Sequence, residues 1–273
     1  MTTGFFDTHA HYDDEAFDGD REALLERLPL EGIARVVNVG ASLASCRRTM
    51  ELAEKYDYIH MALGVHPSEC KEMDEASMAW LRKMCGMEKC VAVGEIGLDY
   101  YWEEPEPKLQ KEWFARQLGL ARECRLPVVI HTRDAARDTV DIMRAEKASE
   151  IGGVVHCFSY TKETARIFLD MGFYIGIGGV LTFNNARKLK EAAEYIPRDR
   201  IVLETDCPYL TPVPNRGKRN SSLNLPYVAA ELARIKDMTE EAVRAATWEN
   251  GLGLYRMEQD GDSHHDFFGN MDR

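Results

Sequence analysis

The chain has 273 residues, 45% of them hydrophobic, and its 34 basic and 46 acidic residues give a net charge of −12. This length and apolar content predict one large domain with a substantial core. The acidic balance argues against a protein that coats nucleic acid nonspecifically, so metals or a small basic cluster would have to hold any polyanion locally.

The seven cysteines are odd in number, and none of them forms a CxxC pair. This pattern indicates a reducing compartment and argues against a disulfide framework or a zinc knuckle. The first residues lack the regions of a signal peptide, and no run of about 18 apolar residues predicts a membrane span. We therefore expect a cytoplasmic protein with no membrane contact, and nothing in the sequence indicates an obligate protein partner.

Eight short apolar segments, most of them rich in β-branched residues, predict strands. In chain order they are Gly4–Thr8, Ile33–Gly40, Ile59–Gly64, Val91–Ile96, Pro127–His131, Gly152–His156, Phe173–Gly178 and Ile201–Thr205. Amphipathic segments lie between them, and helices are predicted at Ser42–Tyr56, Pro107–Cys124, Thr161–Met171, Leu225–Lys236 and Thr239–Tyr255. The first and third of these helices begin at plausible Ser and Thr caps.

Eight alternating β/α units predict a single closed (β/α)8 barrel of the TIM type, followed by extra C-terminal helices. A doubly wound sheet is the alternative, because periodicity does not establish closure. We expect the barrel domain to span residues 1–257. The polar segment 258–273 has the composition of a mobile tail.

Six side chains that bind metals lie at or just after predicted strand ends. The strand ends of a parallel barrel meet at one mouth, so these side chains should converge although they are far apart in sequence. The His-x-His step also directs both imidazoles to the same side of an extended chain. The predicted metal ligands are His9, His11, Glu95, His131, His156 and Asp206.

Four imidazoles and two carboxylates exceed what one tetrahedral ion needs and suit two divalent cations that share Glu95. A water held between two cations loses a proton near neutral pH, which makes a bridging hydroxide the predicted nucleophile. Asp206 is placed to bind one metal and to accept that proton, so Glu95 and Asp206 are the predicted catalytic residues. The mixed ligand set suits Zn, Mn, Ni or Fe better than Mg.

A basic cluster follows the last strand in a proline-rich loop and consists of Arg216, Lys218 and Arg219. At the barrel mouth it would bind substrate phosphates, and a solvated surface loop is the alternative. His66, at the end of the third strand, would contact a phosphate or act as a second acid, or else it packs against the turn before Pro67.

Glu204 and Asp7 stand two residues before Asp206 and His9, so a supporting role behind the metal ligands is expected for both. A third ion beside Glu204 is a further alternative. Tyr100, Tyr101 and Trp102 follow Glu95 and would either stack on bases or pack at the rim of the barrel.

Several segments resemble the TatD family of metal-dependent deoxyribonucleases, in the amidohydrolase-like superfamily. They lie between residue 5 and about residue 250, and the last is the most specific. They read FFDTHAH (5–11), GVHP (64–67), VGEIGLDYY (93–101), LPVVIHTRDA (126–135), GGVVHCFS (152–159), YIGIGG (174–179) and LETDCPYLTPVPNRGKRN (203–220).

The resemblance implies a TIM-like barrel, a pair of divalent metals and phosphodiester hydrolysis from the 3′ end of DNA. It assigns His9, His11, Glu95 and Asp206 to one metal, and Glu95, His131 and His156 to the other. Short or single-stranded 3′ ends are the expected substrate. Hydrolysis of a small ester, lactone or amide is the alternative, and a non-enzymatic scaffold is poorly supported because six converging ligands have no structural purpose there.

Overall fold

The computed structural model describes residues 4–258 and contains one sheet of eight parallel strands, paired in chain order. The order confirms the predicted (β/α)8 barrel and excludes a doubly wound sheet, in which the strand order reverses. The strands are β1 (Phe5–Ala10), β2 (Ile33–Val39), β3 (Ile59–Leu63), β4 (Cys90–Asp99), β5 (Val128–Arg133), β6 (Gly153–Val155), β7 (Tyr174–Ile177) and β8 (Ile201–Leu203).

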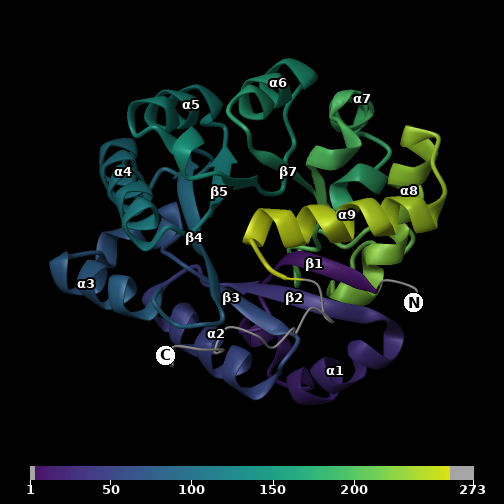
Figure 1. The fold of residues 1–273 in the computed structure, drawn as a ribbon, viewed down its shortest axis with the longest axis horizontal. Coiled ribbons are helices and arrows are strands. Elements are labelled where there is room, and N and C mark those ends of the chain that lie inside the picture. The colour runs from purple at the N-terminus through teal and green to yellow at the C-terminus, as the bar shows by residue number, and fades with distance from the viewer. Residues whose placement is uncertain (1–3, 259–273) are drawn as a thin grey trace, which may run out of the picture.

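Helices surround the barrel, as Figure 1 shows. They are α1 (Arg21–Arg27), α2 (Leu43–Lys55), α3 (Glu75–Met84), α4 (Pro107–Cys124), α5 (Ala136–Ala145), α6 (Lys162–Asp170), α7 (Arg187–Tyr195), α8 (Leu225–Lys236) and α9 (Glu240–Tyr255). Short 3-10 turns also occur at Glu15–Phe17, Pro29–Glu31, Pro67–Glu72, Ala148–Glu150, Gly179–Thr182, Arg198–Arg200 and Ser222–Asn224.

Helix starts follow local capping chemistry in part. The Ser42 side chain accepts a hydrogen bond from the backbone of Ser45 at the start of α2, as the sequence predicts. Thr161 occupies the same position before α6 but its side chain forms no capping hydrogen bond, so only the position of that cap is confirmed. The sequence predicts no bounds for α1, α3, α5 or α7.

The seam between β8 and β1 closes the barrel beyond the end of β8. The hydroxyl of Thr8 donates to the carbonyl of Leu203 at 2.9 Å, and the amide of Asp206 donates to the carbonyl of His9 at 2.9 Å. The amide of His11 donates to the carbonyl of Cys207 at 2.8 Å. These bonds run through the residues that carry the predicted ligands, so closing the barrel also brings Asp206 to His9 and His11.

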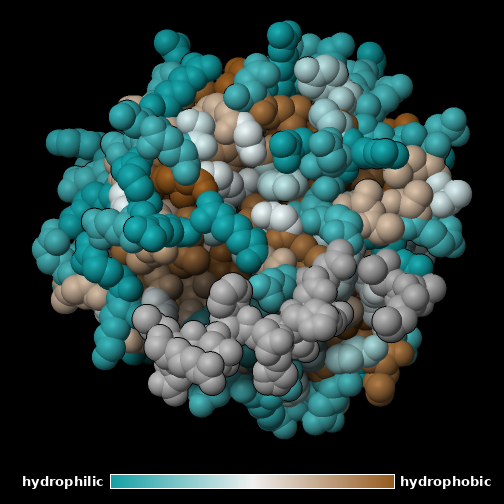
Figure 2. Space-filling view, viewed as in Figure 1, coloured by the Kyte–Doolittle hydropathy of each residue, from teal (hydrophilic) through white to brown (hydrophobic). Residues whose placement is uncertain are grey.

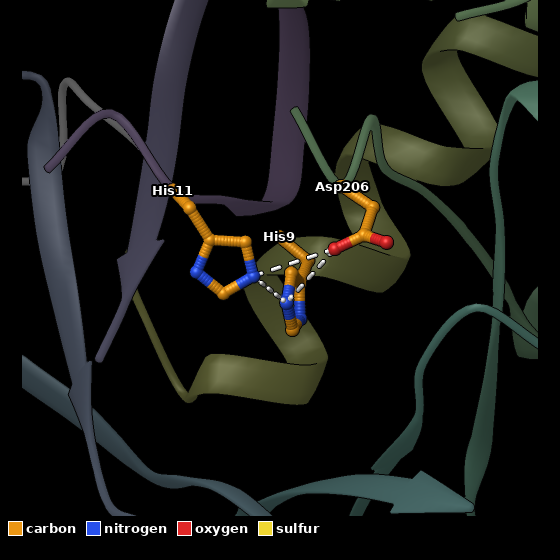
Figure 3. A group of neighbouring side chains, drawn as sticks. All are labelled: His9, His11 and Asp206. Carbon is orange, nitrogen blue, oxygen red and sulfur yellow. Dashed lines mark hydrogen bonds and ion pairs between the residues drawn. The ribbon is translucent and has the colours of Figure 1, made fainter. Parts of the chain in front are cut away.

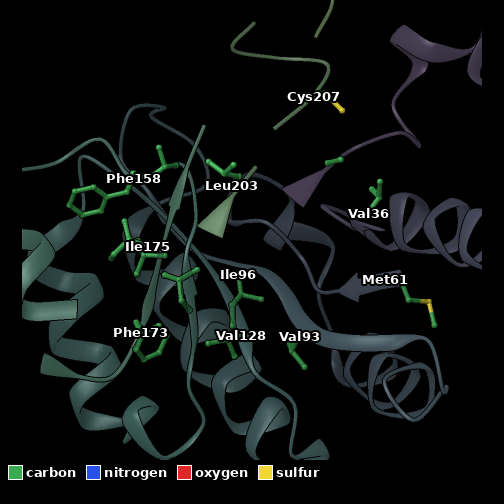
Figure 4. Close-up of a cluster of buried hydrophobic side chains, with 14 of the residues drawn as sticks. Val36, Met61, Val93, Ile96, Val128, Phe158, Phe173, Ile175, Leu203 and Cys207 are labelled. Atoms are coloured by element: carbon green, nitrogen blue, oxygen red, sulfur yellow. The ribbon is translucent and has the colours of Figure 1, made fainter. Parts of the chain in front are cut away.

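Neighbouring strand residues point alternately into the barrel and out toward the helices. The outward set packs against the helix layer and includes Val36, Met61, Val128 and Ile175 (Figure 4). Apart from Phe6, the inward strand residues are small or β-branched, and Trp248 and Tyr255 of α9 cover them at the N-terminal end of the barrel. The helix therefore fills the N-terminal end of the barrel, so that the opposite end, where the strands terminate, is left for the site.

Figure 2 shows the face over which α9 lies, where hydrophilic side chains cover most of the rim. Within residues 4–258 no helix is long and apolar enough to span a membrane. All seven cysteines are free thiols. The tail predicted at 258–273 lies, apart from Glu258, outside the described residues.

Gly97 in β4 permits a close approach between β4 and β5. Its φ is +149°, and a Cβ there would lie 1.9 Å from the carbonyl oxygen of His131. We expect Gly97→Ala to lower the free energy of unfolding by roughly 2–4 kcal/mol, because a backbone strand must move. The measurement is urea unfolding of the metal-free protein.

Gly119→Ala is the matched control, since Gly119 lies inside α4 and a Cβ there meets nothing within 4 Å. This substitution should raise stability by about 0.5–1 kcal/mol through helix propensity. Equal changes in the free energy of unfolding for the two substitutions would contradict the close approach of β4 and β5 at Gly97.

Candidate metal centre

The structure brings all six predicted ligands together at the C-terminal ends of the strands, around the carboxylate of Glu95. Oε1 of Glu95 lies 2.8 Å from Nδ1 of His131 and 2.6 Å from Nε2 of His156. Oε2 lies 3.5 Å from Nε2 of His9 and 3.7 Å from Nε2 of His11. One carboxylate therefore has a pair of imidazoles on each of its two oxygens.

Asp206 completes the group formed by the His-x-His pair. Its Oδ1 lies 3.6 Å from Nε2 of His9 and 3.3 Å from Nε2 of His11, and the two imidazole nitrogens are 3.0 Å apart (Figure 3). All three side chains point toward one another, as Figure 3 shows. The ring of His9 also stacks on the ring of His156 at 4.0 Å between centroids.

Two of the histidines have one nitrogen held by a protein acceptor. Nδ1 of His11 donates to the carbonyl of Val39 at 2.8 Å, and Nε2 of His131 donates to Oδ2 of Asp99 at 3.0 Å. In each ring the other nitrogen faces the Glu95 cluster. When the ring is neutral, this arrangement fixes the tautomer that leaves a lone pair toward the centre of the site.

Asp99 is a member of the site that sequence reasoning missed. It ends β4 four residues after Glu95, so the alternation of the strand points both side chains to the same face. Asp99 is only 3% exposed. Burial by itself raises the pKa of Asp99, but the hydrogen bond from His131 outweighs this and holds the pKa below its ordinary value. The signal available in the sequence was this four-residue spacing.

Glu204 and Asp7 lie behind the cluster and are fully buried. Glu204 accepts a hydrogen bond from the amide of Cys157, and its Oε1 lies 3.9 Å from Nδ1 of His156. Burial raises the pKa of Glu204 to about 8. Asp7 accepts hydrogen bonds from the side chains of Thr205 and Ser222, each at 2.6 Å, and so stabilises the seam between β1 and β8 rather than an imidazole ring.

His66 lies at the edge of the cluster, whereas the three basic residues of the loop after β8 have different surroundings. Nε2 of His66 is 3.8 Å from Oε1 of Glu95, and its ring meets the ring of His131 at 4.3 Å between centroids. Arg219 is bound to both carboxylate oxygens of Asp20 at 2.6 Å. Arg216 lies over the ring of Phe183 at 3.7 Å, and Lys218 is exposed.

The donor set fits divalent cations. Imidazole nitrogens and carboxylate oxygens within 4.8 Å of one another form three groups: His9, His11 and Asp206; His9, Glu95 and His156; and His66, Asp99 and His131. Nδ1 of His156 and Oε2 of Glu204 are buried and have no hydrogen-bond partner among residues 4–258. Neutral nitrogens that converge on anionic oxygens are the ligands that Zn²⁺, Mn²⁺ or Fe²⁺ prefers.

The chain is similar to proteins from several bacteria. The model of the TatD related DNase family matches residues 6–256. YabD from Bacillus subtilis (strain 168), an uncharacterized metal-dependent hydrolase, is 45% identical over 252 residues, which cover 92% of this chain and 99% of that protein. YcfH from Escherichia coli (strain K12), also described as an uncharacterized metal-dependent hydrolase, is 38% identical over 256 residues, which cover 92% of this chain and 96% of that protein.

Among solved structures, the crystal structure of YjjV, a TatD homolog from Escherichia coli K12, superposes with a TM-score of 0.88 at 30% identity, and covers 94% of this chain and 100% of that one. The barrel and its His, Glu and Asp clusters are those of a metal-dependent hydrolase. With the family match over nearly the whole described chain, the protein belongs to the TatD family.

Metal binding should release protons, because nearby carboxylates raise the pKa of two of the histidines more than burial lowers it. Burial lowers the pKa of His11, but the hydrogen bond to Asp206 and the charge of Glu95 raise it to about 10. Burial also lowers the pKa of His131, but the hydrogen bonds to Asp99 and Glu95 raise it to about 9. In the metal-free protein both rings are protonated at pH 7, and a cation must displace those protons.

We expect about two protons to be released per loaded site at pH 7, and the apparent metal affinity should rise as the pH increases toward 9. Calorimetric titration of the apoprotein with Mn²⁺ in buffers of different ionisation enthalpy counts these protons. A heat of binding that is independent of the buffer would contradict the protonated rings.

Asp99→Asn should weaken metal binding by about tenfold or more, because the His131 ring loses the charged acceptor that holds its tautomer. Calorimetry or metal content after dialysis measures this loss. Asp138→Asn is the matched control, since Asp138 pairs with Lys111 and Tyr100 outside the cluster. The same affinity in wild type and Asp99→Asn would show that Asp99 does not support the ligand.

Proposed function

We propose that this chain is a two-metal phosphodiesterase that removes nucleotides from the 3′ end of DNA. The observation that carries the proposal is the division of the Glu95 carboxylate, with His9 and His11 on one oxygen and His131 and His156 on the other. A carboxylate with a pair of imidazole nitrogens beside each oxygen can be shared by two cations. The description of the matched family supports DNA as the substrate.

Two divalent cations bound there would polarise a phosphoryl oxygen and lower the pKa of a bound water toward neutrality. In this proposal His9, His11 and Asp206 hold one cation, and His131 and His156 hold the other. Glu95 joins the two sets. The ligands would not need to rearrange when the cations bind, because closure of the barrel already holds them in place.

Asp206 is the proposed acceptor of the proton that the attacking water would lose. Burial raises the pKa of Asp206, but the hydrogen bond from His11 outweighs this and holds the pKa below its ordinary value, so the carboxylate is ionised at pH 7. His66 lies on the other side of Glu95, where burial lowers its pKa to about 3. A neutral His66 would therefore bind a phosphate oxygen as a hydrogen-bond donor and would not act as an acid.

Arg216 is the member of the basic loop that we assign to phosphate. Its guanidinium stacks on Phe183 and forms no ion pair in the part of the chain that the structure describes, whereas the charge of Arg219 is matched by Asp20. Arg216 keeps its charge for an incoming phosphodiester.

The direct test is cleavage of 3′-labelled and 5′-labelled single-stranded DNA by the purified protein with Mn²⁺, Zn²⁺ or Mg²⁺. We expect mononucleotides to leave first from the 3′ label, and EDTA to stop the reaction. Hydrolysis of simple esters or lactones without cleavage of any oligonucleotide would assign the site to small molecules instead.

Asp206→Asn and Glu95→Gln should each lower kcat by at least about 10³-fold, since each removes a charged group that acts in the reaction. Both substitutions leave the barrel core intact, so the circular dichroism spectrum and the cooperative thermal transition should persist. Arg219→Gln is the control within the basic loop and should change kcat by less than about threefold. Retained turnover in Glu95→Gln would exclude Glu95 from the reaction.

A further inference from the structure

Two large aromatic side chains lie exposed on the loop after β4. Tyr101 is 55% exposed and Trp102 is 57% exposed, and their rings meet edge to face at 4.8 Å between centroids. The other three tryptophans of the chain are buried or half-buried. Folded proteins rarely leave adjacent large aromatic rings in water beside a polar site unless that surface binds a partner.

The position of these rings relative to the metal ligands is fixed by one carboxylate. Oδ2 of Asp99 accepts from Nε2 of His131 at 3.0 Å, and Oδ1 of the same residue accepts from the amide of Tyr101 at 2.9 Å. The preceding residue, Tyr100, donates its amide to the carbonyl of Arg133 at 2.9 Å. The exposed pair therefore begins two residues after Asp99, whose side chain contacts the ligand His131.

A positive charge lies on the same surface. The guanidinium of Arg133, which ends β5 two residues after His131, lies 3.7 Å from the centre of the Tyr101 ring. Within residues 4–258 Arg133 forms no ion pair with a carboxylate. Aromatic faces beside an uncompensated guanidinium match a nucleobase and the phosphate next to it, since bases stack on aromatic rings and arginine binds phosphate.

We propose that Tyr101 and Trp102 form a nucleobase subsite, with Arg133 beside the adjoining phosphate. This inference rests on the proposed phosphodiesterase function and specifies which DNA the site takes. The base of the 3′-terminal nucleotide stacks on the exposed pair while its phosphodiester lies at the cluster. Every base has an aromatic face, so the subsite tolerates any sequence. A base inside a duplex is already stacked on its neighbours, so the subsite selects single-stranded 3′ ends.

The test compares two single-stranded oligonucleotides that differ only in whether the last two 3′ nucleotides carry bases or are abasic. The wild type should prefer the intact oligonucleotide by about tenfold or more in kcat/KM, chiefly through KM. The double substitution Tyr101→Ala, Trp102→Ala should remove most of that preference and leave cleavage of the abasic oligonucleotide nearly unchanged. Tyr195→Ala is the control, because this exposed tyrosine ends α7 at the far end of the barrel.

Binding gives a second measurement that does not depend on turnover. In a Glu95→Gln background the intact oligonucleotide should quench tryptophan fluorescence, the abasic one should not, and Trp102→Phe should abolish the signal. Equal losses on both oligonucleotides in the double variant, or quenching that persists in Trp102→Phe, would overturn the subsite alone. Failure of the wild type to cleave either oligonucleotide would overturn the proposed function and the subsite with it.

Discussion

A buried carboxylate surrounded by imidazoles is the constraint on which the rest of the structure depends. Glu95 is almost completely removed from water, and an unpaired carboxylate in such a place is strongly unfavourable. Burial raises the pKa of Glu95, yet the charge of His156 and the hydrogen bonds from His131 and His156 hold it well below its ordinary value. The site therefore requires positive charge, which either protons or divalent cations can supply. Competition between the two makes metal binding depend on pH.

The same constraint explains the way in which the barrel closes. β8 is only three residues long, and the seam to β1 is completed by Asp206, Cys207 and the side chain of Asp7. Burial raises the pKa of Asp7 to about 6, and the bonds from Ser222 and Thr205 oppose that shift. A seam built from polar groups at the mouth is less regular than a strand ladder, but it places a carboxylate against the His-x-His pair. Gly176 in β7 makes room for the same region, since a Cβ there would meet the Glu204 carboxylate at 2.3 Å.

The sequence predicted the parts of the site that follow from topology. Ligand-type residues at strand ends, combined with the rule that parallel strands end at one mouth, were enough to bring His9, Glu95 and His156 together. Contacts between side chains from different loops could not be read in this way. The role of Asp99 depends on the register between β4 and β5, and the pairing of Arg219 depends on how the loop before α1 approaches the loop after β8. The four-residue spacing of Glu95 and Asp99 gives only their shared face of β4, and propensity carries no information about which loops approach one another.

The net charge of −12 makes the arrangement of arginines at the mouth informative. Arg133 and Arg216 each lie 3.7 Å from the centre of an aromatic ring, Tyr101 for the first and Phe183 for the second. Arg133 ends β5 and Arg216 lies in the loop after β8, and β6 and β7 separate these two strands in the barrel order. Stacking restrains a guanidinium without neutralising it, so these two charges stay available to an anion although the chain as a whole is acidic. Attraction of an anion to this chain therefore depends on local positive groups such as these two arginines and not on the overall charge.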